Sequence, residues 1–334
     1  MSEVPLPPHK LLESPNSRTI EVHGWSITAS TNPISNAQEC DALYATFGIP
    51  LPEMTFGSNV LTLEHKPSGW KYAFTTPGAL GEVKNGELGD GDGGVKVGYA
   101  DKWLESRTDS PSFAMPRTVA KPYDWTYTTT YAGHQYREDE ASPSPASSAS
   151  SLLTVVEAPP RPGPSCESIP WVAADPEDPS QSIPMAELTR QDPIMFYAEI
   201  PLFEDELHDN GSSILLVRIR VMPTCFFILS RFTLRVDNVL FRQFDTRIFH
   251  SFSKSPPTII RETSGWEAPY ERVQRQLPRR EDLHPLTDPG FIAKALAEMP
   301  TRISQREGAK TGWRALGTRR EIIQLAPSSA STPA

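Results

Sequence analysis

The chain has 334 residues, of which 38% are hydrophobic and 34 are proline, so we expect a packed core with part of the length outside it. A net charge of −9 argues against a general nucleic-acid-binding protein, because phosphate contacts need an excess of lysine and arginine. The three widely spaced cysteines and the lack of a long apolar run predict neither a zinc site nor a membrane segment. We therefore expect a soluble protein without a cofactor, located in the cytoplasm, with the nucleus as an additional location.

The N-terminal part combines an arm without periodicity and several strand signals. Residues 1–18 are rich in proline and serine and predict a disordered arm. A short amphipathic helix should begin near Ser35, where Gln38 completes a capping-box pattern, and should end at Gly48. Strands are predicted at 20–30, 59–65, 70–74, 95–100 and 121–129.

Two further segments are predicted to lie outside the packed core. Residues 134–182 are rich in serine and proline, and such a segment cannot bury enough apolar surface to offset its ordering entropy. The polar tail at 301–334 is predicted to be loose. We interpret the chain as a single domain over 19–300, interrupted by a disordered insertion at about 134–182 and resuming with a short helix at 183–190.

The stretch from Gln191 to His250 has the highest density of β-branched and aromatic residues in the chain. Apolar residues recur at every second position from Ile194 to Leu202, and valine and isoleucine alternate with arginine over 217–221. Asp237-Asn238 predicts a two-residue hairpin turn. The stretch predicts an antiparallel meander with one apolar and one arginine-bearing face, and hence an α+β fold with a predominantly antiparallel β-sheet core and a few short helices.

An arginine row in this stretch is the first candidate site. Its members are Arg218, Arg220, Arg231, Arg235, Arg242 and Arg247. Guanidinium groups bind carboxylates through two parallel hydrogen bonds, so a positive ledge on the polar face would suit an acidic peptide. The competing interpretation is internal pairing with the acids between Glu204 and Asp209 and with Asp237, which is common for individual arginines.

An acidic cluster is the second candidate site. It comprises Glu204, Asp205, Glu206, His208 and Asp209. These residue types ligate metals or act as acid–base pairs, but consecutive strand residues point to opposite faces and cannot all converge. Cys225 lies in an apolar strand and is interpreted as an inert core thiol. Two classes of protein remain open on the residues alone: an interaction module and a metal-dependent enzyme that uses the acidic cluster.

Seven sequence blocks carry a resemblance to a known family. They are LPEMTFGSNVLTLEH (51–65), WLESR (103–107), KPYDWTYTTTYAG (121–133), LFEDELHDNGSS (202–213), VRIRVMP (217–223), RFTLRVDNVLFR (231–242) and DTRIFH (245–250). On these blocks the chain resembles the TIPRL family, the Tap-interacting (TIP-forty-one-like) regulators of type 2A protein phosphatases in TOR signalling. The resemblance covers about Ile20 to Glu262, apart from the insertion.

The resemblance implies a non-enzymatic α+β protein. Such proteins bind the catalytic subunits of type 2A-like phosphatases, or the Tap/alpha-four adaptor that holds those subunits. The resemblance places partner binding at Ile183 and Asp245. We add Arg231, Arg235 and Arg247 to this predicted partner-binding set from the arginine row.

One position departs from the family pattern. The family usually has an aspartate, tied to phosphatase binding, before the Ala-Leu that follows the second early strand, and here that residue is Gly78. Either the interface of this protein is modified, or the family's aspartate supports only local structure.

Overall fold

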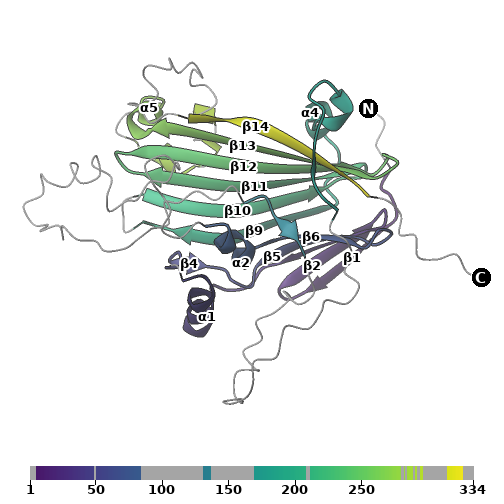
Figure 1. Cartoon of the computed structure of the whole chain (residues 1–334), viewed down its shortest axis with the longest axis horizontal. Coiled ribbons are helices and arrows are strands. Elements are labelled where there is room, and N and C mark those ends of the chain that lie inside the picture. Colours follow the sequence, from purple (N-terminus) through teal and green to yellow (C-terminus); the bar gives the residue numbers. More distant parts are fainter. Residues whose placement is uncertain are drawn as a thin grey trace, which may run out of the picture.

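The chain folds into two antiparallel β-sheets that share one hydrophobic core (Figure 1). This computed structural model describes residues 5–48, 50–83, 131–136, 169–207, 211–279, 282, 284–288, 290–291, 294–295 and 314–325. The predicted α+β class, with a mainly antiparallel sheet core and few short helices, is confirmed.

The larger sheet has eight strands in the order β4-β9-β10-β11-β12-β13-β14-β8. Its long strands are β9 (Phe196–Asp205), β10 (Gly211–Val221), β11 (Cys225–Val236), β12 (Leu240–Ser251), β13 (Thr258–Pro269) and β14 (Arg314–Gln324). The short strands β4 (Met54–Thr55) and β8 (Val172–Ala173) lie at its two ends. Strands β9 to β12 form the predicted meander, because period-two alternation directs one set of apolar side chains to one face.

The smaller sheet has six strands in the order β1-β2-β3-β5-β6-β7. They are β1 (His9–Ser14), β2 (Ser17–Val22), β3 (Trp25–Ser30), β5 (Val60–His65), β6 (Trp70–Thr75) and β7 (His134–Gln135). The single strand predicted at 20–30 is instead part of the β2–β3 hairpin. His23 and Gly24 take φ values of 49° and 80°, and two adjacent residues with positive φ form a tight two-residue turn.

Both chain ends contribute strands where we predicted disorder. The disordered arm predicted at 1–18 is wrong from His9 onward, because β1 pairs with β2 along its whole length. The loose tail predicted at 301–334 is wrong at Arg314–Gln324, where β14 pairs with β13 and buries Ile323. In both segments backbone hydrogen bonds to a neighbouring strand supply the order that side-chain composition does not predict.

The helices are short. They are α1 (Ala37–Phe47), α2 (Thr76–Gly81), α4 (Met185–Leu188) and α5 (Tyr270–Gln274), with the 3-10 turns η3 (Pro179–Gln181) and η4 (His284–Thr287). Helix α1 begins one residue later than predicted, because Asn36 and Glu39 form the capping box, and it ends at Gly48 with φ 65°. None of the described helices has the length and apolar content needed to cross a membrane.

The structure corrects two loop predictions, and some other predicted segments lie outside the residues it describes. The hairpin at Asp237 has a three-residue loop, since Val236 pairs with Leu240 and Asn238 takes φ 62°. The insertion predicted at 134–182 has β7, β8 and η3 at its described ends, so the prediction of disorder is wrong there. The strands predicted at 95–100 and 121–129, the WLESR block, and residues 137–168 lie outside the described residues.

Trp25 of β3 marks the centre of the shared core. Its ring lies 5.0 Å from Phe226 of β11, and 4.8 Å from each of His65 and His250. The face of the larger sheet that packs on the smaller sheet, which we call the inner face, is therefore sealed, and its opposite, outer face is left to be covered by other elements.

Candidate functional site

The outer face of the eight-stranded sheet is covered at both ends of its long strands. At one end Ile183, next to α4, packs with Phe249 of β12. At the other end Val273 of α5 packs with Phe241 of β12. Figure 1 shows α4 and α5 at these opposite ends of the sheet. The middle of the outer face lies between the two covered ends.

A row of side chains that we call the outer strip occupies this middle region. It consists of Leu216, Arg218, Leu229, Arg231, Asp245 and Arg247. Strand register brings them together across β10, β11 and β12. Arg218 and Arg247 both lie opposite Leu229, and Leu216 and Asp245 both lie opposite Arg231. Directly opposed residues of antiparallel strands share a face, so the strip is one continuous surface.

The outer strip contains a small hollow between β10 and β11. The hollow lined by Arg218, Arg231 and their neighbours on β10 and β11 has a volume of about 20 Å³, which is room for roughly one water molecule. At this place the described residues form a shallow depression beside the predicted positive ledge. A partner would therefore lie across the strip rather than insert deeply into it.

Asp245 organises the charges of the outer strip although it is only 3% exposed. Arg231 donates to it through Nε and Nη2, each at 2.8 Å, and Arg247 donates through Nη2 at 3.0 Å. Gln243 adds a longer contact of 3.4 Å through Nε2. Two guanidinium groups around one carboxylate offset the cost of burying it and leave the cluster with a surplus positive charge.

Arg218 and Arg235 also have carboxylate partners. Arg218 Nε donates to Glu199 at 2.7 Å, and both side chains are about two-fifths exposed. Arg235 pairs with Asp237 at 3.0 Å and donates to the Leu286 carbonyl at 3.4 Å. Arg235 therefore lies at the end covered by α5, outside the outer strip. Internal pairing thus accounts for part of the predicted ledge.

Arg242 does not belong to the ledge, and its inclusion in the row was wrong. It lies opposite Leu234, on the inner face, and is 1% exposed. Its spacing of five residues from Arg247 on the same strand already requires opposite faces, because side chains alternate with period two.

Ile183, which was predicted to bind the partner, is buried. It is 6% exposed and packs with Met222, Cys225, Phe249 and Ile260. Two residues further on, Met185 of α4 is 64% exposed. Ile183 therefore anchors the segment that covers one end of the outer face.

The acidic cluster divides between the two faces of β9. Glu204 lies opposite Ile214 on the outer face, and Asp205 lies opposite Ser213 on the inner face. Asp205 is buried and accepts a hydrogen bond from the Leu207 backbone at 2.9 Å. The described residues contain no group of three metal-ligating side chains, and 208–210 lie outside them.

Burial raises the pKa of the Cys225 thiol to about 11, as an inert core thiol requires.

Gly78 has no room for a side chain. A Cβ atom there would lie 2.5 Å from the His134 ring and 2.8 Å from the Tyr131 hydroxyl. These two side chains are hydrogen-bonded at 2.9 Å, and the Tyr131 oxygen also accepts from the Thr75 backbone at 2.9 Å. The space that an aspartate would need at position 78 is therefore filled by His134, beside a cavity of about 690 Å³ lined mainly by amide and hydroxyl side chains.

Three residues of the site were not found from the sequence. Leu216 and Leu229 are half-buried members of the outer strip, and Glu199 pairs with Arg218. The two leucines have the same parity along their strands as the outer-facing arginines, which was a usable signal. The Glu199–Arg218 contact depends on the register between β9 and β10, and periodicity within one strand does not give it.

The fold and site together define a two-sheet α+β protein with an arginine-bearing outer face. The sequence model of the TIP41-like family matches residues 54–274. The chain is 39% identical to a human TIP41-like protein over 81% of this chain and 83% of the relative. It is 34% identical to the Saccharomyces cerevisiae type 2A phosphatase activator TIP41, over 80% of this chain and 67% of that protein. It is 33% identical to an Arabidopsis thaliana TIP41-like protein, over 84% of this chain and 87% of that protein.

These matches settle the family. The chain belongs to the TIP41-like family. The resemblance drawn from its sequence blocks is thereby confirmed.

Proposed function

We propose that this protein is a regulator without catalytic activity of its own, which binds type 2A-like phosphatase catalytic subunits, or the Tap/alpha-four adaptor that holds them, in TOR signalling. Two relatives support the phosphatase role by name: the type 2A phosphatase activators of Saccharomyces cerevisiae and Schizosaccharomyces pombe. The sequence blocks that resemble the TIPRL family support the same partners.

The observation that carries the proposal is the open outer strip between two covered ends. Guanidinium groups at Arg218 and Arg247, with side chains 40% and 36% exposed, present N–H donors on a rigid sheet. Asp245 takes two donors from Arg231 and one from Arg247 of the five that each group carries. The donors that Asp245 does not use can bind a carboxylate of the partner.

The geometry favours a folded partner that lies flat on the strip. A hollow of about 20 Å³ admits no side chain, whereas an acidic surface or tail laid across the strip would meet Arg218, Arg231 and Arg247 together. Leu216 and Leu229 would supply apolar contact between the charges. Binding that depends on exposed charges should weaken with added salt, because mobile ions screen them.

Asp245 and Ile183 have indirect roles in this proposal. Asp245 fixes the two arginine heads, and Ile183 holds the α4 segment that covers one end of the outer face. Arg235 lies outside the strip and should matter less for partner binding than Arg247. This order of effects distinguishes the outer strip from a general positive ledge.

The test is capture of a purified type 2A phosphatase catalytic subunit by the full chain and by charge-reversed variants. Arg218→Glu and Arg247→Glu should each reduce binding by about tenfold, since each replaces an attraction by a repulsion. Lys66→Glu is the matched control: its side chain is 48% exposed, it forms an ion pair with Glu21, and it lies in the turn between β5 and β6, away from the outer strip. Wild-type binding by both arginine variants would show that the site assignment is wrong.

A second measurement addresses the non-enzymatic part of the proposal. Elemental analysis of the purified chain should find no stoichiometric divalent metal. A bound metal lost on Glu204→Gln would instead favour the enzyme hypothesis. Affinity purification from native extract, followed by identification of the partners, distinguishes the catalytic subunit from the adaptor.

A further inference from the structure

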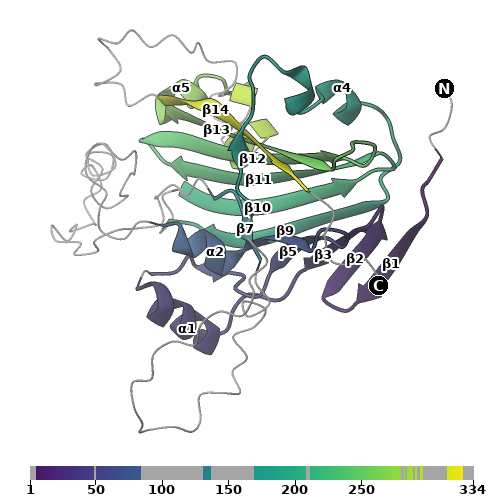
Figure 2. The same ribbon diagram turned by 45° about the vertical axis from the view of Figure 1, so that its right-hand side comes forward.

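Three of the four edge strands of the two sheets are very short, and β1 is the exception. Strands β4, β7 and β8 have two residues each, whereas β1 has six. Figure 2 shows β1 as the outermost strand of its sheet, and no strand in the described part of the chain pairs with its outer edge. Open edges of this length are templates for pairing with another chain, and proteins usually shorten or cover them.

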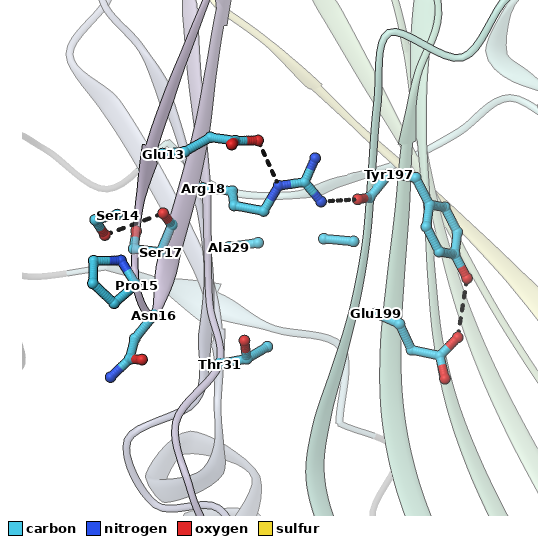
Figure 3. Close-up of a pocket in the computed structure, with 11 residues that line it drawn as sticks. Glu13, Ser14, Pro15, Asn16, Ser17, Arg18, Ala29, Thr31, Tyr197 and Glu199 are labelled. Atoms are coloured by element: carbon cyan, nitrogen blue, oxygen red, sulfur yellow. Dashed lines mark hydrogen bonds and ion pairs between the residues drawn. The ribbon is translucent and has the colours of Figure 1, made fainter.

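The edge of β1 is held in a fixed position. Arg18 of β2 donates from Nε to Glu13 of β1 at 3.3 Å, and from Nη1 to the Tyr197 carbonyl of β9 at 3.1 Å (Figure 3). The β1–β2 hairpin is therefore tied to the larger sheet. A strand that is already ordered loses little further entropy when it pairs, which favours binding at this edge.

The backbone register decides which residues of β1 can pair outward. Ser14 lies opposite Ser17 across a two-residue turn, and such a closing pair exchanges its hydrogen bonds within the hairpin. Alternate residues of β1 therefore direct their backbone groups toward β2. The remaining residues, which direct N–H and C=O outward, are His9, Leu11 and Glu13.

The side chains of β1 are exposed on both faces of its sheet. All six residues are exposed, including Leu11 at 46% and Leu12 at 42%. Neighbouring strand residues point to opposite faces, so the two leucines lie on different faces. A strand added to this edge would cover both.

We propose that the occupant of this edge is a second copy of the chain, paired antiparallel about a two-fold axis through Leu11. A two-fold axis perpendicular to a sheet pairs odd-numbered residues of one copy with odd-numbered residues of the other, and even-numbered residues with even-numbered ones. Because residues 9, 11 and 13 direct their backbone groups outward, the axis passes through residue 11, the middle one of the three. Leu11 then faces Leu11 of the second copy. His9 faces Glu13 on either side, and Lys10 faces Leu12.

Self-complementarity argues for a second copy over an unrelated strand. In this register a central apolar pair is flanked on both sides by a basic residue opposite an acidic one, and no like charges are opposed. The joined strands would form one continuous sheet across the two copies. A six-residue strand pair buries less than a standard interface, so dimerisation should be weak, with a dissociation constant of roughly 10 μM or above.

Sedimentation of the full chain over a concentration series tests the pairing. Leu11→Glu places two carboxylates directly opposite each other and should weaken self-association by about tenfold or more. Leu12→Glu is the matched control, since it is equally exposed but would face Lys10 of the second copy. It should leave self-association unchanged or strengthen it.

Cysteine cross-linking tests the register. In the proposed pair the two Leu11 Cα atoms would be about 5.5 Å apart, within disulfide range, whereas the two Leu12 Cα atoms would be roughly 8 Å apart. Mild oxidation should therefore cross-link Leu11→Cys and not Leu12→Cys. The wild-type chain, which has its own cysteines at 40, 166 and 225, is the control.

Three outcomes would overturn the proposal. They are a wild-type chain that stays monomeric throughout the series, equal cross-linking of the two cysteine variants, and unchanged self-association in Leu11→Glu. If Leu11→Glu lowers phosphatase capture while the wild type stays monomeric, the edge takes a partner's strand instead.

Discussion

The inner and outer faces of the eight-stranded sheet are built by the same strands, yet they have different environments. The inner face packs on the smaller sheet around Trp25 and Phe226, both at most 1% exposed. The outer face has two small apolar clusters at its ends and charged side chains between them. Alternation along a strand produces two chemically distinct faces, and what covers each face decides how much a given residue type contributes to stability or binding.

The largest expected effect comes from two neighbouring phenylalanines on opposite faces. Phe226→Ala should lower the free energy of unfolding by about 3–5 kcal/mol, because it opens a cavity in the sealed core. Phe227→Ala should cost about 1–2 kcal/mol, since the ring is half-buried against Arg220 on the outer face. Urea unfolding of the two variants measures the difference. Equal losses would contradict the division between a sealed and an open face.

Breaking an ion pair should likewise cost more unfolding free energy on the inner face than on the outer face. Arg261 on the inner face donates to Glu321 from Nε at 3.0 Å and Nη2 at 2.6 Å, and its guanidinium lies over Trp171. Glu321→Gln should cost about 3 kcal/mol, because it leaves a buried positive charge without its partner. Glu199→Gln, which breaks the exposed pair with Arg218, should cost less than about 1 kcal/mol. Thermal unfolding of the two variants compares the costs.

Acid should destabilise the fold through the inner face. Burial lowers the pKa of His250 to about 4, from an ordinary value near 6.5, and burial also lowers the pKa of His65. Between about pH 6.5 and pH 4 the unfolded chain therefore binds more protons than the folded chain, so the free energy of unfolding decreases as the pH falls. The loss due to His250 should reach about 3 kcal/mol near pH 4.

Urea unfolding over a pH series checks this prediction, with His250→Gln as the comparison. The variant should show a shallower dependence between about pH 6.5 and pH 4, because it lacks the titrating ring. An unchanged slope would mean that His250 is not the group responsible.

The smallest expected effect lies within the outer strip. Arg247→Gln should change the free energy of unfolding by less than about 1 kcal/mol, because its side chain is 36% exposed and gives one hydrogen bond to Asp245. Arg231→Gln should cost about 2 kcal/mol, since it breaks a bidentate pair in a more buried position. Denaturant midpoints separate the two variants, and the reverse order would contradict the geometry around Asp245.

Periodicity explains what could be predicted about the strands and where the predictions stopped. The alternation over 217–221 predicted that strand and its buried face, because the pattern is local to the chain. The strand β1 was missed because its side chains bury nothing, and only its pairing with β2 orders it. The Arg242 assignment was wrong for a different reason, since the parity that excludes it was already present in the sequence.

The sequence by itself determined the family, the antiparallel meander, and the residue types on each strand, since motifs and period-two alternation are properties of a short stretch of chain. The tertiary structure decided which of those residues are accessible. Asp245 lies beneath two arginines and Ile183 lies beneath α4, while Arg218 and Arg247 face solvent. That outcome depends on strand register and on which distant segments cover the outer face. Both are set by contacts between residues far apart in the chain, which no local pattern encodes.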